Sequence, residues 1–249
     1  MKTYCLNTEI SSVSIDTIIN DIYNKKYITI AGCNVNTAVR SYYDESLSKI
    51  INSFDYRIPD GYPLTWPLNI SSEQKYNRLA GADIFDYLVE NDTQLRHFFL
   101  GDTEEVLKMM EKNLNRKNEK FQISGLYSPP FTPIDEWDLE KIAKLVLNSN
   151  TDMLWVGLGF PKQEIFISKI RHLLPEVSVY GAGAIFQWTA KVKNRAPVSW
   201  QKAGFEWLWR LVNDPKRLWR RYLIDNTLFI FLFLKQYLNK SKFSQPLRD

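Results

Sequence analysis

Short apolar runs that close on glycine recur along the chain, and longer amphipathic stretches separate them. Alternation of this kind favours a parallel sheet with crossover helices. We therefore predict an α/β fold, a Rossmann-like and mostly parallel sheet with flanking helices. The expected strands are 27–31, 57–59, 96–100, 121–124, 152–156 and 177–180. The expected helices are 15–22, 37–54, 78–89, 103–114, 133–147 and 165–174, after a polar entry segment.

Beyond Arg195 the pattern changes to helices alone. One helix is expected over 200–212, and a second runs on to 238. Asp214 and Pro215 between them suit an N-cap and a first helical position. We predict an α/β catalytic domain over 1–195 and a helical appendage over 196–249.

The composition is that of a folded soluble protein, with 45% hydrophobic and 24% charged residues in 249. Cys5 and Cys33 show no metal or redox spacing, which suggests a reducing compartment. Residues 1–10 lack the apolar core of a signal peptide. The longest apolar run, 228–234, is far shorter than the roughly 20 residues that span a bilayer. These features predict a cytoplasmic protein.

Positive charge is concentrated in the appendage. Residues 193–221 hold eight Lys or Arg and two acidic residues, a local balance of +6 in a chain of net charge +4. Five of the eight tryptophans lie in or just before this stretch. Such a surface suits anionic lipid headgroups, with tryptophan at the interfacial level, while a solvated basic face is the plainer alternative.

The stretch 156–164 looks like the centre of a binding site. Gly157 and Gly159 let the backbone approach a ligand closely, and Pro161 opens a helix whose first N–H groups favour phosphate. Gln163 and Glu164 follow in the first helical turn. Eight of the ten glycines, including the pair Gly181 and Gly183, are expected just past strand ends, where open α/β sheets bind ligands. Their positions are 32, 61, 101, 125, 157, 159, 181 and 183.

Several site chemistries are missing from the chain. Lys162 and Phe186 occupy the positions where a dinucleotide fingerprint needs its third glycine. There is no Asp-x-Asp pair to hold a divalent ion, and no P-loop, nucleophile elbow or zinc spacing. His97 and His172 are better explained as structural than as catalytic residues. We expect a nucleotide-diphosphate sugar as ligand, with no cofactor and no metal.

Asp60 is the best catalytic candidate. Held between Pro59 and Gly61 at a strand end, its carboxylate could remove a proton from an acceptor hydroxyl. A plain Asp-Gly turn explains the same residues equally well. Arg78 could bind phosphate or form a surface ion pair. Asn34 could hold sugar hydroxyls or cap a helix.

Arginines in the appendage could take the place of a metal ion. Arg217 lies four residues before Arg221 and three before Arg220, so one helix face could present them together. Arg210 belongs to the preceding helix. Clustered in this way, arginines could neutralise a leaving diphosphate.

The motifs together resemble a known family, the WecG/TagA/CpsF glycosyltransferases (glycosyltransferase family twenty-six). The resemblance covers roughly residues 28–225. Its motifs are Asp60-Gly61 with Trp66, Arg78-x-x-Gly81-x-Asp83, Phe99-Leu100-Gly101, Gly157-Leu158-Gly159-x-Pro161-Lys162-Gln163-Glu164, Gly181-x-Gly183-Ala184, Arg195-Ala196-Pro197, and Glu206-Trp207-Leu208-x-Arg210-Leu211 followed by Pro215, Arg217, Arg220, Arg221 and Tyr222.

The resemblance implies a membrane-associated, metal-independent, inverting transferase. Such enzymes move a sugar from a UDP-sugar to a polyprenyl-diphosphate-linked saccharide, building teichoic acid, common antigen, capsule or exopolysaccharide at the inner face of the cell membrane. By resemblance, Asp60 is the base, Asn34, Arg78 and Gln163 line the site, and Arg210, Arg217 and Arg220 cover the diphosphate.

One departure concerns the acceptor. Many members carry a threonine where this chain has Gly32, and Thr37 is the hydroxyl that could replace it. The complete predicted substrate site is Asn34, Thr37, Arg78, Gly81, Asp83, Gly101, Gly157, Gly159, Pro161, Gln163, Glu164, Gly181, Gly183, Arg210, Arg217 and Arg220, with Asp60 as catalytic residue.

Two other functions stay open at this point. A non-catalytic adaptor could use the basic helices on a membrane or nucleic acid, although we expect no nucleic-acid partner. A nucleotide-sugar epimerase is the second, and the missing dinucleotide fingerprint and Tyr-x-x-x-Lys argue against its usual redox form. The donor sugar, of N-acetylmannosamine or glucose type, the acceptor and a homo-oligomeric state are not determined by the sequence.

Overall fold

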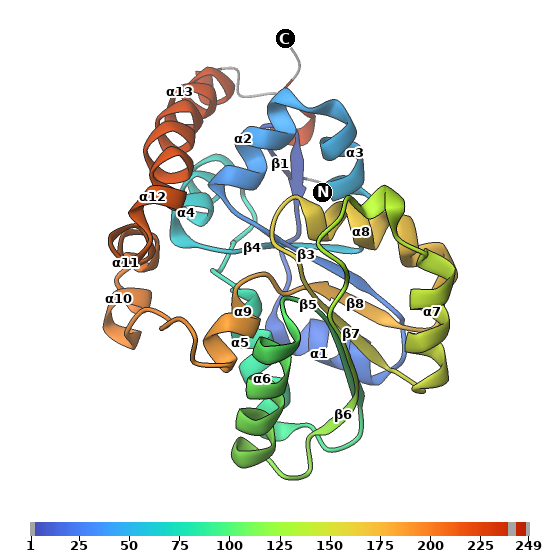
Figure 1. The fold of residues 1–249 in the computed structure, drawn as a ribbon. Helices are drawn as coiled ribbons and strands as arrows, with labels where there is room; N and C mark the ends of the chain where they lie inside the picture. The colour runs from blue at the N-terminus through green and yellow to red at the C-terminus, as the bar shows by residue number, and fades with distance from the viewer. Residues whose placement is uncertain (1–2, 239–242, 248–249) are drawn as a thin grey trace.

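The computed structural model describes residues 3–238 and 243–247 and is built on a parallel sheet (Figure 1). All neighbouring strands of this six-stranded sheet run parallel, in the order β4-β3-β8-β7-β5-β6. In chain order they are β3 (Thr29–Cys33), β4 (Tyr56–Pro59), β5 (Arg96–Gly101), β6 (Gln122–Tyr127), β7 (Met153–Gly157) and β8 (Ser178–Gly181). The predicted α/β class and each of the predicted strands are confirmed, with small shifts at their ends.

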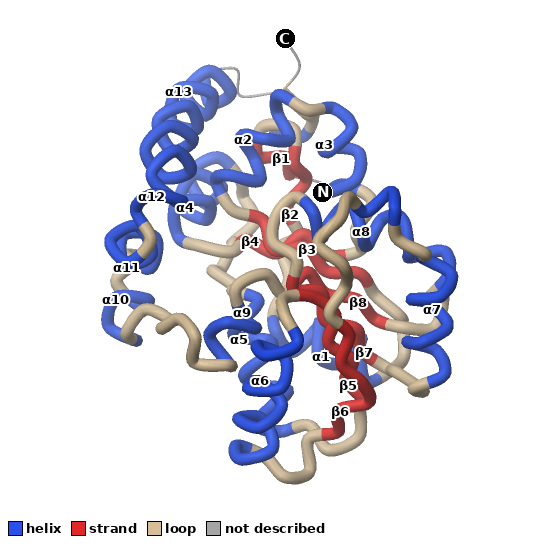
Figure 2. The backbone as a smooth tube through the Cα atoms, in the orientation of Figure 1, coloured by secondary structure: helices blue, strands red, loops and turns tan. Residues whose placement is uncertain are grey.

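Helices cover both faces of the sheet, which makes three layers (Figure 2). Alternate residues of β7 face opposite layers: Leu154 and Val156 join one buried cluster, Met153 and Trp155 the other. The first layer holds α2 (Val35–Tyr43), α3 (Glu45–Asn52), α7 (Leu139–Asn148) and α8 (Lys162–Ile170). The second holds α1 (Ile15–Tyr23), α5 (Gly81–Asn91), α6 (Glu104–Lys117) and α9 (Ile185–Thr189).

The structure divides the predicted helices 37–54 and 133–147 and shortens 78–89. The stretch 37–54 breaks at Asp44, whose side chain accepts from Leu47 N at 2.9 Å and so starts α3. The stretch 133–147 becomes the short η1 (Ile134–Glu136) followed by α7. The third, 78–89, begins only at Gly81. An unpredicted α4 (Tyr62–Ser71) precedes it, and Arg78 lies in the extended segment between them.

The N-terminal segment is a hairpin that the sequence pattern did not predict. β1 (Thr3–Cys5) pairs antiparallel with β2 (Thr8–Ile10). Leu6 in its turn donates its N–H to Gln236 Oε1 at 2.9 Å and accepts from Leu247 N at 3.0 Å. The two ends of the described chain therefore meet at this hairpin.

The appendage has more breaks than expected. The helix predicted over 200–212 divides at Gly204, which has φ of +80°, into α10 (Val198–Lys202) and α11 (Glu206–Asn213). Asp214 and Pro215 restart the chain as predicted, and α12 (Pro215–Trp219), the π-helical η3 (Arg220–Ile224) and α13 (Asp225–Leu238) follow. No helix among the described residues is long and apolar enough to cross a membrane.

The last helix of the appendage, α13, packs against the sheet domain. Phe229 and Leu232 of α13 belong to the same buried cluster as the first helical layer, and Asn36 Nδ2 donates to Asp225 Oδ2. Helices α10 to α12 lie along one side of the sheet domain (orange in Figure 1). The chain thus passes from the sheet through α10 to α12 and is anchored again by α13.

Candidate active site

Two cavities lie side by side at the carboxyl ends of the strands. The larger, with about 1130 Å³ of free space open to solvent, is formed by the turns after β3, β4, β7 and β8 together with residues of the appendage. We call it the sheet-edge cleft. The smaller, with about 670 Å³, lies between α4, the start of α2 and the appendage. We call it the appendage cavity.

Most of the predicted site residues line one or both of these cavities. Asp60, Asn34 and Arg210 line both. Arg78 lines the appendage cavity. The sheet-edge cleft is also lined by Gly81, Gly157, Gly159, Gln163, Glu164, Gly181, Gly183 and Arg217.

Five predicted residues are outside both linings. Thr37 is buried in α2, and its hydroxyl has no hydrogen-bond partner among the residues that the structure describes. Gly101 is pressed against the end of β7, because a Cβ on it would lie 2.5 Å from Gly157 O. Pro161 is the N-cap of α8 rather than its first residue. Asp83 and Arg220, described below, also lie away from the free space.

Asp60 occupies the junction of the two cavities. It follows β4 directly, and its N–H donates to Cys33 O at 2.7 Å, which holds it at the end of the neighbouring strand. Burial raises the pKa of its carboxyl to about 6; Glu206 adds to the rise, whereas Arg78 and Arg210 oppose it. A carboxyl that titrates near neutrality and faces both spaces is suited to general-base work.

Arg78 connects the sheet domain to the appendage. Its guanidinium forms ion pairs with Asp83 at 3.0 Å and with Glu206 at 3.4 Å. Asp83 in turn accepts from Ala80 N at 3.2 Å and pairs with Arg195 at 2.9 Å. Arg78 therefore forms an ion pair, one of the two roles that the sequence offered for it, and the pair is partly buried at the wall of the appendage cavity.

Gln163 joins the two paired-glycine turns. Its Oε1 accepts from Gly159 N at 3.1 Å and from Gly183 N at 3.0 Å. Its Nε2 donates to Glu164 Oε1 at 2.9 Å. The N–H groups of these two glycines are thus used to hold the two turns of the cleft together.

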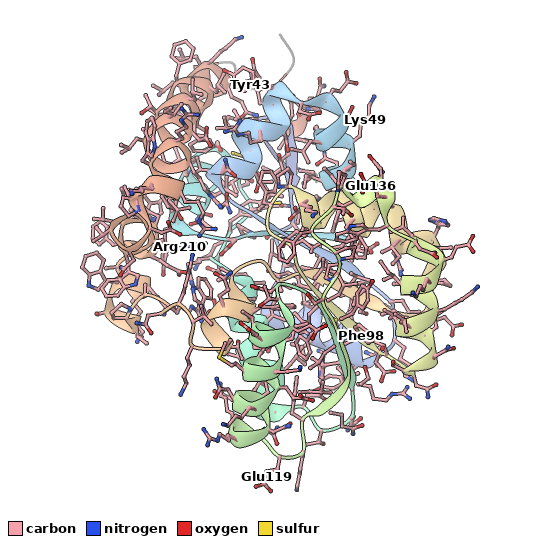
Figure 3. The ribbon with its side chains drawn as sticks, viewed as in Figure 1. Tyr43, Lys49, Phe98, Glu119, Glu136 and Arg210 are labelled. Carbon is pink, nitrogen blue, oxygen red and sulfur yellow. The ribbon has the colours of Figure 1, made fainter. Side chains whose placement is uncertain are left out.

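The arginines of the appendage do not all face the same way. Arg210, Arg217 and Arg221 line the sheet-edge cleft, and Figure 3 shows Arg210 on the side of α11 toward the sheet domain. Arg220 is exposed, with its guanidinium 5.2 Å from the ring centroid of Trp219. Within the part of the chain that is described, Arg221 has an unpartnered Nε, and burial lowers the pKa of its guanidinium.

Sequence reasoning did not assign Glu206 or Trp188 to the site, and it named Arg221 only among the arginines that could neutralise a diphosphate. Trp188 lies between two guanidinium groups, 5.6 Å from Arg195 and 5.3 Å from Arg210, and lines the sheet-edge cleft. Glu206 and Arg221 are part of the motifs quoted above, but the sequence pattern did not show that both residues line the two cavities.

His97 has a structural environment, as expected. It is fully buried, pairs through Nε2 with Asp92 at 2.8 Å, and accepts from Trp155 Nε1 at 3.1 Å. Burial lowers the pKa of its ring. Among residues 3–238 and 243–247, no three His, Cys, Asp or Glu side chains are grouped so as to hold a metal ion.

The turns at the strand ends and the appendage form an arginine-lined cleft, and Asp60, Asn34 and Arg210 are among the residues that it shares with the appendage cavity. Open parallel sheets bind ligands at this edge. Comparison with known proteins identifies the class of protein. Residues 3–243 match the model of the glycosyl transferase WecG/TagA/CpsF family, and the chain belongs to this family. It is a hexosyltransferase.

Two similar proteins share the name N-acetylglucosaminyldiphosphoundecaprenol N-acetyl-beta-D-mannosaminyltransferase. The Bacillus subtilis protein is 29% identical over 92% of this chain and 90% of its own length. The Bacillus spizizenii protein is 32% identical over 70% of this chain and 66% of its own length.

Proposed function

We propose that the protein transfers an N-acetylmannosamine-type sugar from a UDP-sugar to a saccharide on polyprenyl diphosphate, with inversion and without a metal ion. The names of the two similar Bacillus proteins support this donor and acceptor chemistry. The observation that carries the proposal is the position of Asp60, which borders both the sheet-edge cleft and the appendage cavity.

In this proposal the two cavities hold the two substrates. The donor occupies the sheet-edge cleft, with its diphosphate toward Arg210, Arg217 and Arg221. The acceptor sugar enters the appendage cavity beside Tyr62 and Trp207, whose rings provide stacking surfaces for a pyranose. The acceptor hydroxyl then meets the anomeric carbon next to Asp60.

The reaction is a single displacement. Asp60 takes the proton of the acceptor hydroxyl, and the oxygen forms a bond to the anomeric carbon on the face opposite the diphosphate. The bond from that carbon to the diphosphate oxygen breaks, and its electron pair leaves with UDP. The guanidinium groups stabilise the charge that develops on UDP, the role that a divalent ion performs in other transferases.

A lipid-linked acceptor requires the appendage cavity to open near a membrane. Large apolar side chains are exposed on the appendage and on α4, among them Ile70, Val212, Phe231 and Leu238. Lys202, Lys216 and Arg220 are exposed on α10, α12 and η3 of the appendage. We infer peripheral binding to the cytoplasmic face of the membrane, with apolar side chains in the headgroup layer and basic ones on anionic lipid. The product would enter a cell-surface polysaccharide.

The test is the Asp60→Asn variant, assayed with UDP-N-acetylmannosamine and a short-chain polyprenyl-diphosphate acceptor. We expect transfer to fall by roughly 10³-fold or more while donor binding persists, because Asn cannot accept the proton. Near-normal turnover would refute the base assignment. Wild-type enzyme should retain its rate in EDTA, and a strict requirement for a divalent ion would contradict the arginine mechanism.

A further inference from the structure

The hydrogen-bond chain through Gln163 has a fixed direction. Gly159 N–H and Gly183 N–H can only donate, so the Gln163 oxygen must face them. The amide nitrogen of Gln163 then faces Glu164 Oε1, which must accept. Any proton on the Glu164 carboxyl is therefore carried by its other oxygen, Oε2.

Glu164 Oε2 is a polar atom without a partner at the wall of the sheet-edge cleft. Glu164 is 1% exposed, and Oε2 has no hydrogen-bond partner among the described residues. Buried polar atoms are almost always paired, so an unpaired one in the lining of a ligand cleft indicates a ligand contact.

The groups around Glu164 place this contact near the reacting centre. The negative charges of Glu164 and Asp60 both raise the pKa of Cys33, at the end of β3, and that of Tyr180, in β8. The positive charge of Arg221 lowers the pKa of Glu164, and the negative charge of Asp60 raises the pKa of Arg221. The part of a donor that lies between Asp60 and the arginines is its sugar.

We propose that Glu164 is a sugar-binding residue that remains neutral at work and donates a hydrogen bond from Oε2 to an oxygen substituent of the transferred sugar. This inference rests on the proposed function, because it requires a nucleotide sugar in the sheet-edge cleft. It gives Glu164 a role in donor binding and orientation and leaves the proton transfer to Asp60.

The electrostatic environment is consistent with a neutral Glu164. Burial raises the pKa of its carboxyl to about 7, against the opposing effects of Gln163, the backbone N–H of Glu164 and Arg221. An arriving diphosphate adds negative charge and raises this pKa further, so donor binding takes up a proton. The affinity for donor should therefore weaken as the pH rises above about 7, the pKa of the free protein.

The experiment measures donor binding by titration calorimetry in the Asp60→Asn background, which removes turnover and the titration of Asp60. The probes are UDP-N-acetylmannosamine and UDP, from roughly pH 6 to pH 8.5. Adding Glu164→Gln supplies a permanent N–H donor in the same place, whereas Glu164→Ala supplies none. Glu176→Gln, on an exposed glutamate outside both cavities, is the matched control.

At roughly pH 6, where Glu164 is mostly protonated, we expect Glu164→Ala to lose roughly tenfold in affinity for the UDP-sugar and to keep its affinity for UDP, since one hydrogen bond to the sugar is removed. Glu164→Gln should bind the UDP-sugar at least as tightly as the parent at high pH, with the pH dependence gone. Unchanged UDP-sugar binding by Glu164→Ala, or equal weakness of Glu164→Gln and Glu164→Ala, overturns the inference alone. Failure of the Asp60→Asn protein to bind UDP-sugar or UDP overturns the proposed function with it.

Should Glu164→Ala fail to fold, Glu164→Gln decides the question. A donor affinity that still falls above about pH 7 in that variant is not caused by Glu164 and refutes the inference.

Discussion

The guanidinium of Arg78 and the carboxylate of Glu206 form an ion pair at 3.4 Å, which ties the segment before α5 to the first turn of α11. Both side chains line the appendage cavity beside Asp60. They act on its carboxyl in opposite directions: Glu206 raises the pKa of Asp60 and Arg78 lowers it. Burial is the main cause of the raised pKa of Asp60, and the docked appendage adjusts that pKa through Glu206.

The first prediction concerns Glu206→Gln. Removing this negative charge favours the ionised form of Asp60, and Arg78 then keeps its ion pair with Asp83 but loses the one with Glu206. In the wild type, kcat/KM should rise with pH through about 6, the pKa of Asp60. In the variant we expect the midpoint of that rise to move to lower pH by a fraction of a unit.

The opposite substitution is the control. Arg78→Gln removes a positive charge and should move the same midpoint to higher pH. Because the readout is a midpoint, a general loss of activity in either variant does not obscure it. Shifts in the same direction for both variants would contradict the charge assignment.

The second prediction is that Asp60→Asn stabilises the protein at neutral pH. The folded pKa of Asp60 is about 6, above its ordinary value of 3.8, so the folded state holds the proton more tightly than the unfolded one. Wild-type stability should then fall as the pH rises from about 4 through about 6, whereas the neutral asparagine side chain of the variant has no charge to bury.

Thermal unfolding at several pH values measures this effect. The variant should exceed the wild type in Tm by a few degrees at pH 7 to 8, with the gain vanishing near pH 4. A constant difference in Tm at all pH values would show that charge burial at Asp60 is not its cause.

The strand ends were predictable because their signal is local. An apolar run closing on glycine, as at Val156-Gly157, predicts a buried strand, and Asp60 could be placed at the sheet edge because it follows such a run. The break at Gly204 was also visible as a glycine, but the apolar spacing on both sides favoured one helix.

Long-range pairing could not be predicted in the same way. The β1–β2 hairpin is stabilised by Gln236, more than two hundred residues away, so the local pattern of residues 3–10 looked only polar. The use of Gln163 as the acceptor for Gly159 and Gly183 likewise depends on β8 lying beside β7. Spacing rules describe one element at a time.

The third prediction tests that use of Gln163. Gln163→Ala leaves two partly buried N–H groups and the buried Glu164 Oε1 without their partner, and a buried polar group left unpaired costs about 1–3 kcal/mol. We expect a Tm several degrees lower and weaker UDP-sugar binding. Gln163→Glu keeps an acceptor for the glycines but cannot donate to Glu164, so its stability deficit should be larger at pH 8 than at pH 5, where Glu164, with a pKa of about 7, is protonated. Wild-type stability in the alanine variant would refute this role.

The orientation of the appendage arginines depends on a π-helical turn. On an α-helix, residues three and four positions after Arg217 share its face, so the spacing predicted that Arg220 and Arg221 lie beside it on one face. In the structure η3 (Arg220–Ile224) is π-helical, and a wider turn changes which side chains share a face. Arg221 lines both cavities, while Arg220 is exposed beside Trp219.

The fourth prediction separates these two adjacent arginines. Arg221→Gln should lower kcat by roughly 10²-fold or more, because a positive charge at the wall of both cavities is lost where the leaving diphosphate develops charge. Arg220→Gln should cost at least tenfold less with a soluble short-chain acceptor, yet weaken binding to anionic vesicles by about 1 kcal/mol, the contribution of one basic residue at a lipid surface. Assays of turnover and of vesicle sedimentation on both variants make the comparison, and each variant controls for the other because the residue type and helix are shared. Equal losses of kcat would instead support the role that family resemblance gives Arg220 and would mean that η3 turns when the donor binds.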